Sequence, residues 1–377
     1  MTRLPVLAAI LFLASPGHAA TIHVPGDQPT IQAGINAAAA NDVVLVAPGT
    51  YLEHIVLKSD IALVSSTGPS VTIIDGRASA TVIYANAVSH TSVVGFTIQN
   101  GQGSYGGTGT HGGGIALVGC GPSVEVMGNL IRQNTAWDGG GMGVWSGNGP
   151  TITNNIFDSN VSVAQGPSSY GVGAAIFLDN AGTPVIMGNV FQNNHCDRGA
   201  SAIHCFNASA PLIDHNVILG NQCADINPPS GACIVARNAA TISNNLIAYN
   251  VGCRAFWFGN NLNGNPSVEN TIIAFNDFTL LAECHSSSNP SFSCTDIHGN
   301  SGGDWTGCVA SFLGVNGNIS EDPLFCDVSS DDFHLQSDSP CAPANSAGCG
   351  LIGALDVGCG PIAVEEVSWT GIKGRYR

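Results

Sequence analysis

Six short segments of the sequence carry side chains that could do chemistry. Each begins with small residues, which allow a tight turn, and continues as a run typical of a β-strand. Successive side chains of a strand point to opposite faces, so every second residue is expected to point inward. The segments are GGGIALV (112–118), GGGMGVW (139–145), GAAIFLD (173–179), ASAIHCF (200–206), GACIVAR (231–237) and CRAFWFG (253–259).

The outward positions of these segments form a candidate ligand-binding face. Aromatic side chains stack on the apolar faces of sugar rings, and charged neighbours bind hydroxyls or carboxylates. We therefore expect non-catalytic binding of a polysaccharide or a cell-surface glycan. An insertion such as VSVAQGPSSY (161–170) could instead fold over the strands and bury the aromatic rings. The ligand-binding set is Trp145, Phe177, Asp179, His204, Phe206, Arg237 and Trp257.

The alternative function for this face is catalytic. Asp179, His204 and Arg237 could serve as acid, base and substrate clamp of a polysaccharide lyase or glycoside hydrolase. Side chains one or two repeats apart would lie roughly 5–10 Å from one another, within reach of one glycosidic bond.

A second row of charged residues accompanies the repeats. Because its signs are mixed, it predicts a surface ladder of salt bridges, which is seldom catalytic and contributes little stability. The row consists of Asp138, Asp197, Arg198, Asp225 and Arg254.

Seven segments share the pattern apolar-x-x-[Asn or Thr]-x-apolar-x-x-Asn, and this repeat predicts the fold. Their closing asparagines are separated by 24 to 34 residues, a period typical of a solenoid. The short runs rich in Val, Ile and Phe, broken by Gly and Asn, indicate strands and turns rather than helices. The closing residues are Asn134, Asn160, Asn194, Asn221, Asn250, Asn276 and Asn300.

These closing asparagines predict a structural ladder. An amide repeated at one turn position can bond to the same residue on the next coil, about 4.8 Å away, and satisfy polar groups that the turn would bury. We expect interior members such as Asn221 to have partners on both sides and Asn300 to have a partner on one side only.

The two ends of the solenoid require covers. A helix over Thr30 to Ala40 is expected to cover the first coil and protect its edge. Near the other end, Cys326, Cys341, Cys349 and Cys359 are expected to staple a C-terminal segment over the last coil, with Cys341–Cys349 the favoured pair.

The N-terminus indicates export. Residues 1–20 have a basic start, an apolar run too short to span a membrane and a small-residue exit, typical of a signal peptide. The 13 cysteines, none before position 120, favour an oxidising compartment, and their odd number predicts an unpaired thiol. We expect a secreted or cell-surface monomer with no transmembrane segment after signal removal. The expected parts are a signal peptide (1–20), a β-helix with its cap (21–300), a C-terminal capping segment (301–361) and a tail (362–377).

Charge and composition narrow the partners. The net charge of −16 argues against nucleic acid and favours a neutral glycan over a polyanionic one. No cysteine or histidine group has zinc-site spacing, so no metal or other cofactor is expected. Calcium binding by the acidic residues between 322 and 338 is an open alternative, but their spacing departs from an EF-hand loop and favours a solvated surface.

The N-terminal third carries a family resemblance. The runs IQAGINAAAANDVVLVAPGTYLEHI (31–55), TIIDGR (72–77) and VVGFTIQN (93–100) resemble the first coils of pectate-lyase-like β-helix proteins, and the similarity extends over about 21–300. It implies an all-β chain, a right-handed parallel β-helix (solenoid) with an N-terminal helical cap and a disulfide-stapled C-terminal segment. No stretch matches the catalytic motifs of pectinesterases or pectate lyases, so the resemblance implies no catalytic residue.

Overall fold

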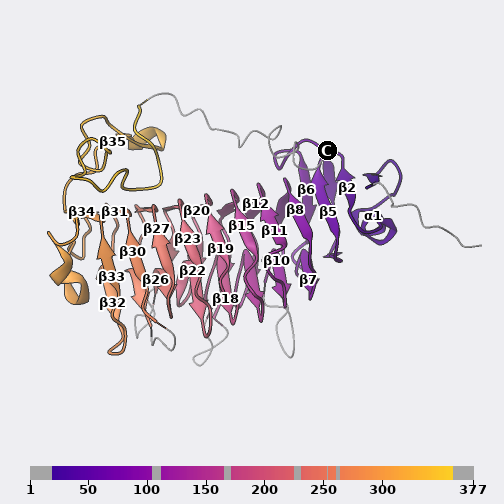
Figure 1. Ribbon diagram of the computed structural model, residues 1–377. Helices are drawn as coiled ribbons and strands as arrows, with labels where there is room; N and C mark the ends of the chain where they lie inside the picture. Colours follow the sequence, from indigo (N-terminus) through magenta and orange to yellow (C-terminus); the bar gives the residue numbers. More distant parts are fainter. Residues whose placement is uncertain are drawn as a thin grey trace, which may run out of the picture.

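The computed structural model describes residues 19–103, 112–164, 171–224, 231–252, 254–259 and 264–359. Most of the expected signal peptide and the expected tail lie outside these residues, as do Asp225 and residues 165–170 of the expected insertion. The described chain winds into a parallel β-helix whose strands stack along one axis (Figure 1).

The strands form three long parallel sheets and two small ones. The eleven-stranded sheet consists of β1 (Thr21–Val24), β2 (Asp42–Val46), β5 (Ile61–Ser65), β8 (Thr91–Val94), β11 (Val124–Met127), β15 (Thr151–Thr153), β19 (Val185–Met187), β23 (Leu212–Asp214), β27 (Thr241–Ser243), β30 (Ser267–Glu269) and β33 (Ser291–Ser293). The ten-stranded sheet consists of β3 (Gly49–Tyr51), β6 (Thr72–Asp75), β9 (Thr97–Gln99), β12 (Leu130–Arg132), β16 (Ile156–Asp158), β20 (Val190–Gln192), β24 (Val217–Leu219), β28 (Leu246–Ala248), β31 (Ile272–Ala274) and β34 (Asp296–His298).

The nine-stranded sheet contains the six segments that begin with small residues. It consists of β4 (Ile55–Val56), β7 (Ile83–Asn86), β10 (Ile115–Val118), β14 (Met142–Trp145), β18 (Ile176–Asp179), β22 (Ala200–Phe206), β26 (Ala232–Ala236), β29 (Arg254–Phe258) and β32 (Ala282–Cys284). A short sheet joins β13 (Thr135–Ala136), β17 (Val161–Ser162), β21 (His195–Cys196) and β25 (Gln222–Cys223), and β35 (Phe325–Asp327) pairs antiparallel with β36 (Asp332–Leu335).

The inward register expected for these six segments is confirmed. The first inward residues of successive strands pair directly with one another and are fully buried. This column is Ile115, Met142, Ile176, Ile203, Ile234 and Phe256. Its regularity follows from the period-two pattern, since a slip by one residue would expose the whole apolar set.

The closing asparagines form a continuous ladder inside one turn column. Each amide nitrogen donates to the Oδ1 of the next asparagine at 2.8–3.1 Å, from Asn134 to Asn300. Each nitrogen also donates to a backbone carbonyl of the preceding coil, such as that of Phe191 for Asn221. The expectation for the end of the ladder is wrong, because Asn300 donates to Asp304 Oδ1 at 3.0 Å and so has partners on both sides.

A second ladder runs parallel to the first, at the fourth position of the repeat. Its amides bond in the same way, at 3.0–3.1 Å. Thr271 and Thr295 continue the column on the last coils, where Thr271 Oγ1 accepts the backbone N–H of Asn245. The asparagines of this second ladder are Asn129, Asn155, Asn189, Asn216 and Asn245.

The N-terminal helix α1 (Ile31–Ala37) is shorter than the expected Thr30 to Ala40. Thr30 is its N-cap and accepts a hydrogen bond from the Ala33 N–H. The helix ends at Ala37 because the next residue is extended and Asp42 then binds the backbone N–H of Ala39. Ile31 and Ile35 are buried in the main core, so the helix covers the first coil.

The favoured disulfide Cys341–Cys349 does not form. Cys349 is bonded to Cys294 on the solenoid, whereas Cys341 is a buried free thiol. Cys326 and Cys359 pair with each other, and Cys284 pairs with Cys308. Free thiols are expected from the odd cysteine count, and the described residues contain five of them, all buried.

The C-terminal segment covers two parts of the solenoid, its last coil and the outer face of one sheet. Trp305 and Phe312, the latter at the end of η1 (Gly307–Phe312), pack on Phe292 and close the last coil. The chain beyond them, including η2 (Val328–Ser330), then lies against the outer face of the ten-stranded sheet, where Phe333 and Leu335 share a core with Leu246. The disulfide prediction was wrong because this path brings Cys349 back to the solenoid, where it bonds to Cys294.

Candidate functional site

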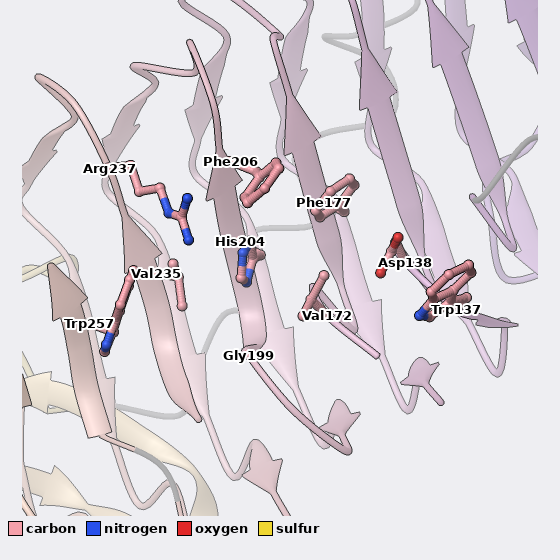
Figure 2. A pocket seen from close by; sticks show the side chains of 10 residues that line it. All are labelled: Trp137, Asp138, Val172, Phe177, Gly199, His204, Phe206, Val235, Arg237 and Trp257. Carbon is pink, nitrogen blue, oxygen red and sulfur yellow. The ribbon is translucent and has the colours of Figure 1, made fainter. Parts of the chain in front are cut away.

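A pocket of about 530 Å³ opens on the outer face of the nine-stranded sheet (Figure 2). Strands β18, β22, β26 and β29 provide its floor, and turn residues ahead of β14, β18 and β22 provide one rim. Phe177, His204, Val235 and Trp257 stand side by side because the parallel register pairs them in that order. The lining residues are Trp137, Asp138, Val172, Phe177, Gly199, His204, Phe206, Val235, Arg237 and Trp257.

Five of the seven residues predicted to bind ligand line this pocket: Phe177, His204, Phe206, Arg237 and Trp257. The other two, Trp145 and Asp179, lie beside it. The Trp145 ring is 5.8 Å from that of Phe177 and lies over Gly143, where even a Cβ would meet the ring at 1.7 Å. Asp179 accepts hydrogen bonds from the side-chain amides of Asn180 and Asn207 at 2.9 and 2.6 Å.

The pocket has an inner and an outer part. Phe177 and His204 are only 6 % and 7 % exposed, so neighbouring side chains cover most of the inner part. The two rings are 5.7 Å apart, and Phe206 lies 6.3 Å from His204. Phe206 and Trp257 are half-buried, so the exposed part of each side chain is the part of the wall that a ligand could reach.

Arg237 reaches over the outer aromatic rings. Its Cζ is 4.6 Å from the centroid of Phe206 and 5.2 Å from that of Trp257, distances typical of cation–π contacts. Burial lowers the pKa of Arg237, but a guanidinium stays charged in a protein. Its Nε is buried without a hydrogen-bond partner.

His204 is neutral in this site. Burial, and then the charge of Arg237, lower the pKa of His204 to about 3. Its Nδ1 is buried without a hydrogen-bond partner. A neutral imidazole with so low a pKa can accept a hydrogen bond, but it is a poor general base at neutral pH.

Asp138 is the pocket residue that sequence reasoning misplaced. Expected in a surface row of salt bridges, its side chain instead points into the pocket from the turn ahead of β14 (Figure 2). Burial raises the pKa of the Asp138 carboxyl to about 7, and the negative charge of Asp179 also raises it. A hydrogen bond from the backbone of Val172 acts in the opposite direction and lowers the pKa. Strand alternation could not give its direction because it lies in a turn.

Two further members of that charged row, Arg254 and Asp197, each lie close to a residue outside it. Arg254 is paired with Glu283 at 3.1 Å, and Asp197 lies 3.7 Å from the ring of His195. Among the described residues, no group of three or more His, Cys, Asp or Glu side chains is arranged to hold a metal ion. The same residues include no helix of the length and apolar character needed to cross a membrane.

Residues 81–272 match the family described as the right handed beta helix region. The chain belongs to this family. The match confirms the expected right-handed parallel β-helix and covers every strand that forms the pocket floor. No curated protein matches the chain.

Several solved structures are similar to this chain at low sequence identity. The rice weevil pectin methyl esterase is 11% identical, with 75% of this chain and 89% of that chain covered and a TM-score of 0.40. The A-module of the Azotobacter vinelandii mannuronan C-5 epimerase AlgE4 is 14% identical, with 72% and 73% covered and a TM-score of 0.38. The catalytic domain of a GH87 alpha-1,3-glucanase is 15% identical, with 76% and 66% covered and a TM-score of 0.35.

Proposed function

We propose that this chain is an extracellular protein that binds a glycan in the pocket on the nine-stranded sheet. The observation that carries the proposal is the outer wall, where Phe206, Trp257 and the Arg237 guanidinium stand together. Exposed aromatic surface packs against the apolar faces of sugars, and a few placed polar groups fix the orientation of the sugar. The disulfides in the C-terminal half support an oxidising, extracellular location.

The lateral position of the pocket favours a chain-like ligand. Its walls come from successive coils, whose strands lie about 4.8 Å apart, so a ligand along the axis meets a new side chain at each step. From Asp138 to Trp257 the pocket spans the coils of β14, β18, β22, β26 and β29. A glycan of several sugars fits this arrangement better than a single sugar does.

A glycan panel tests the proposal directly. The purified protein is screened for binding, and the same mixtures are assayed for new reducing ends and unsaturated products. Binding that Trp257→Ala abolishes, without product release, supports a binding protein. If the intact protein retains no glycan, the proposal is wrong.

A second candidate function, a polysaccharide lyase or glycoside hydrolase, is favoured by one specific observation. Asp138 has a pKa of about 7, so near neutral pH part of the protein carries a protonated carboxyl in the pocket wall. In this alternative Asp138 donates the proton in place of Asp179, and Arg237 keeps its expected role as the substrate clamp. His204 contributes hydrogen bonding, because its low pKa makes it a poor base.

A further inference from the structure

Arg237 differs from Arg132 and Arg254 in what balances its charge. Arg254 has a carboxylate partner, Glu283, at 3.1 Å and donates to the Gly231 carbonyl at 3.2 Å. Arg132 donates twice to Gln99 Oε1, at 2.9 and 3.0 Å. Arg237 contacts two aromatic rings, and within the described chain it has neither an ion pair nor a hydrogen bond.

The contacts of Arg237 do not fully offset the free energy of moving its charge out of water. Burying a charge is costly unless the charge is paired and hydrogen-bonded, and contacts with ring faces offset only part of that free energy. The rings do, however, hold the guanidinium in place. Figure 2 shows it extending from the end of β26 into the space between Phe206 and Trp257. Its N–H groups are therefore positioned toward the pocket before any ligand arrives.

The group that best completes this site is a carboxylate. The planar fork of a guanidinium matches the two oxygens of a carboxylate and can bind both at once. The bond would form in a partly desolvated pocket, where a charge-assisted hydrogen bond is stronger than in water.

The rest of the pocket limits how many negative charges the ligand can carry. Arg237 is its one cationic side chain among the lining residues, while Asp138 lies at the opposite end and Asp179 beside it. The protein as a whole carries a net charge of −16. A second ligand carboxylate placed toward Asp138 would meet like charge where that carboxyl is ionised.

We propose that the pocket selects a glycan with an isolated uronic acid residue in an otherwise neutral chain, and that Arg237 binds the carboxylate of that residue. This inference rests on the proposed glycan binding and deepens it. It also revises the neutral glycan expected from net charge, since one local cation outweighs a distant acidic surface across the screening length of salt solution.

Three matched oligosaccharides of equal length test the inference: one neutral, one with a single uronic acid and one with a uronic acid at every position. We expect the single-acid ligand to bind about tenfold or more tightly than the neutral one, as one charge-assisted pair allows. The fully acidic ligand should bind more weakly than the single-acid one. Raising the pH from 6 to 8 should widen that gap, because Asp138 ionises through about pH 7.

Arg237→Gln should make the neutral and single-acid ligands bind equally, while its unfolding midpoint reports that the fold is retained. Arg132→Gln is the matched control, since Arg132 lies on the ten-stranded sheet outside the pocket, and it should keep the preference. Equal binding of neutral and single-acid ligands by the unmodified protein overturns the inference but leaves the proposed function intact. Absence of binding to all three overturns both.

Discussion

The thiol of Cys341 donates a hydrogen bond to the buried carboxyl of Asp296, with 3.3 Å between Sγ and Oδ2. Asp296 is the first residue of β34, the last strand of the ten-stranded sheet, and pairs there with Ile272. Its carboxyl also accepts a hydrogen bond from the backbone N–H of Glu321 at 3.1 Å. The contact therefore joins the solenoid to the segment that covers its outer face. Burial raises the pKa of Asp296 to about 6, against opposing hydrogen bonds and the charge of His298.

The burial of Asp296 predicts that the protein loses stability as the pH rises from about 4 to about 7. The folded pKa of Asp296 lies above its unfolded value, so the stabilisation is complete below about pH 4 and is lost as the pH passes about 6. A shift of this size corresponds to roughly 3 kcal/mol of unfolding free energy. Asp296→Asn should flatten the dependence of the unfolding midpoint on pH and raise the midpoint at pH 8. Asp327→Asn, which changes an exposed acid of the covering segment, should not change the pH dependence in this range.

The asparagine ladder predicts similar losses at its middle and at its end. Asn221→Ala removes amide bonds to both neighbours and leaves buried backbone groups without partners, at roughly 1–3 kcal/mol for each group. Asn300→Ala should cost a comparable amount, because it breaks bonds to Asn276 and Asp304. Denaturant unfolding of both variants checks this, with the exposed helix residue Asn36→Ala as control. A much milder effect at Asn300 would show that Asp304 contributes little.

These ladders show what a repeat can predict. A residue that returns at one position of a regular coil must meet its own copy on the next coil, so the pattern alone implies the contact. The inward column from Ile115 to Phe256 follows for the same reason. The pairing of Cys294 with Cys349 could not be predicted in this way, because it joins residues 55 apart through a segment with no period.

The site was predictable only in part. Alternation gives the side of the sheet on which Phe177 and His204 lie, but their depth depends on side chains from other coils and from turns. The carboxyl of Asp138 enters from such a turn, where neither the period nor a motif gives its direction. Depth in turn determines protonation, as the low pKa of His204 shows.

The aromatic wall predicts that glycan affinity depends strongly on Trp257. Trp257→Ala removes a half-buried ring and one of the two faces that hold Arg237, so binding should weaken about tenfold or more. Titration calorimetry with the best ligand of the panel measures the change. Tyr249→Ala is the control, since Tyr249 stacks on Phe275 and lies outside the pocket. Equal weakening in both variants would indicate a general loss of structure instead of a lost contact.

Asp138 offers the sharpest separation of binding from catalysis. If the protein cleaves a glycan, the protonated carboxyl is the active form, so the rate should fall as the pH rises through about 7. Asp138→Asn cannot supply a proton and should lower product release about 100-fold, within the range typical of a general acid. Binding of the same glycan should persist, because the ring faces of Phe206 and Trp257 are unchanged.

Asp179→Asn provides the comparison for this prediction. Removing the charge of Asp179 should lower the pKa of Asp138 and shift the pH profile of the cleavage rate toward acid. Cleavage that survives Asp138→Asn at full rate would place the chemistry elsewhere on the chain.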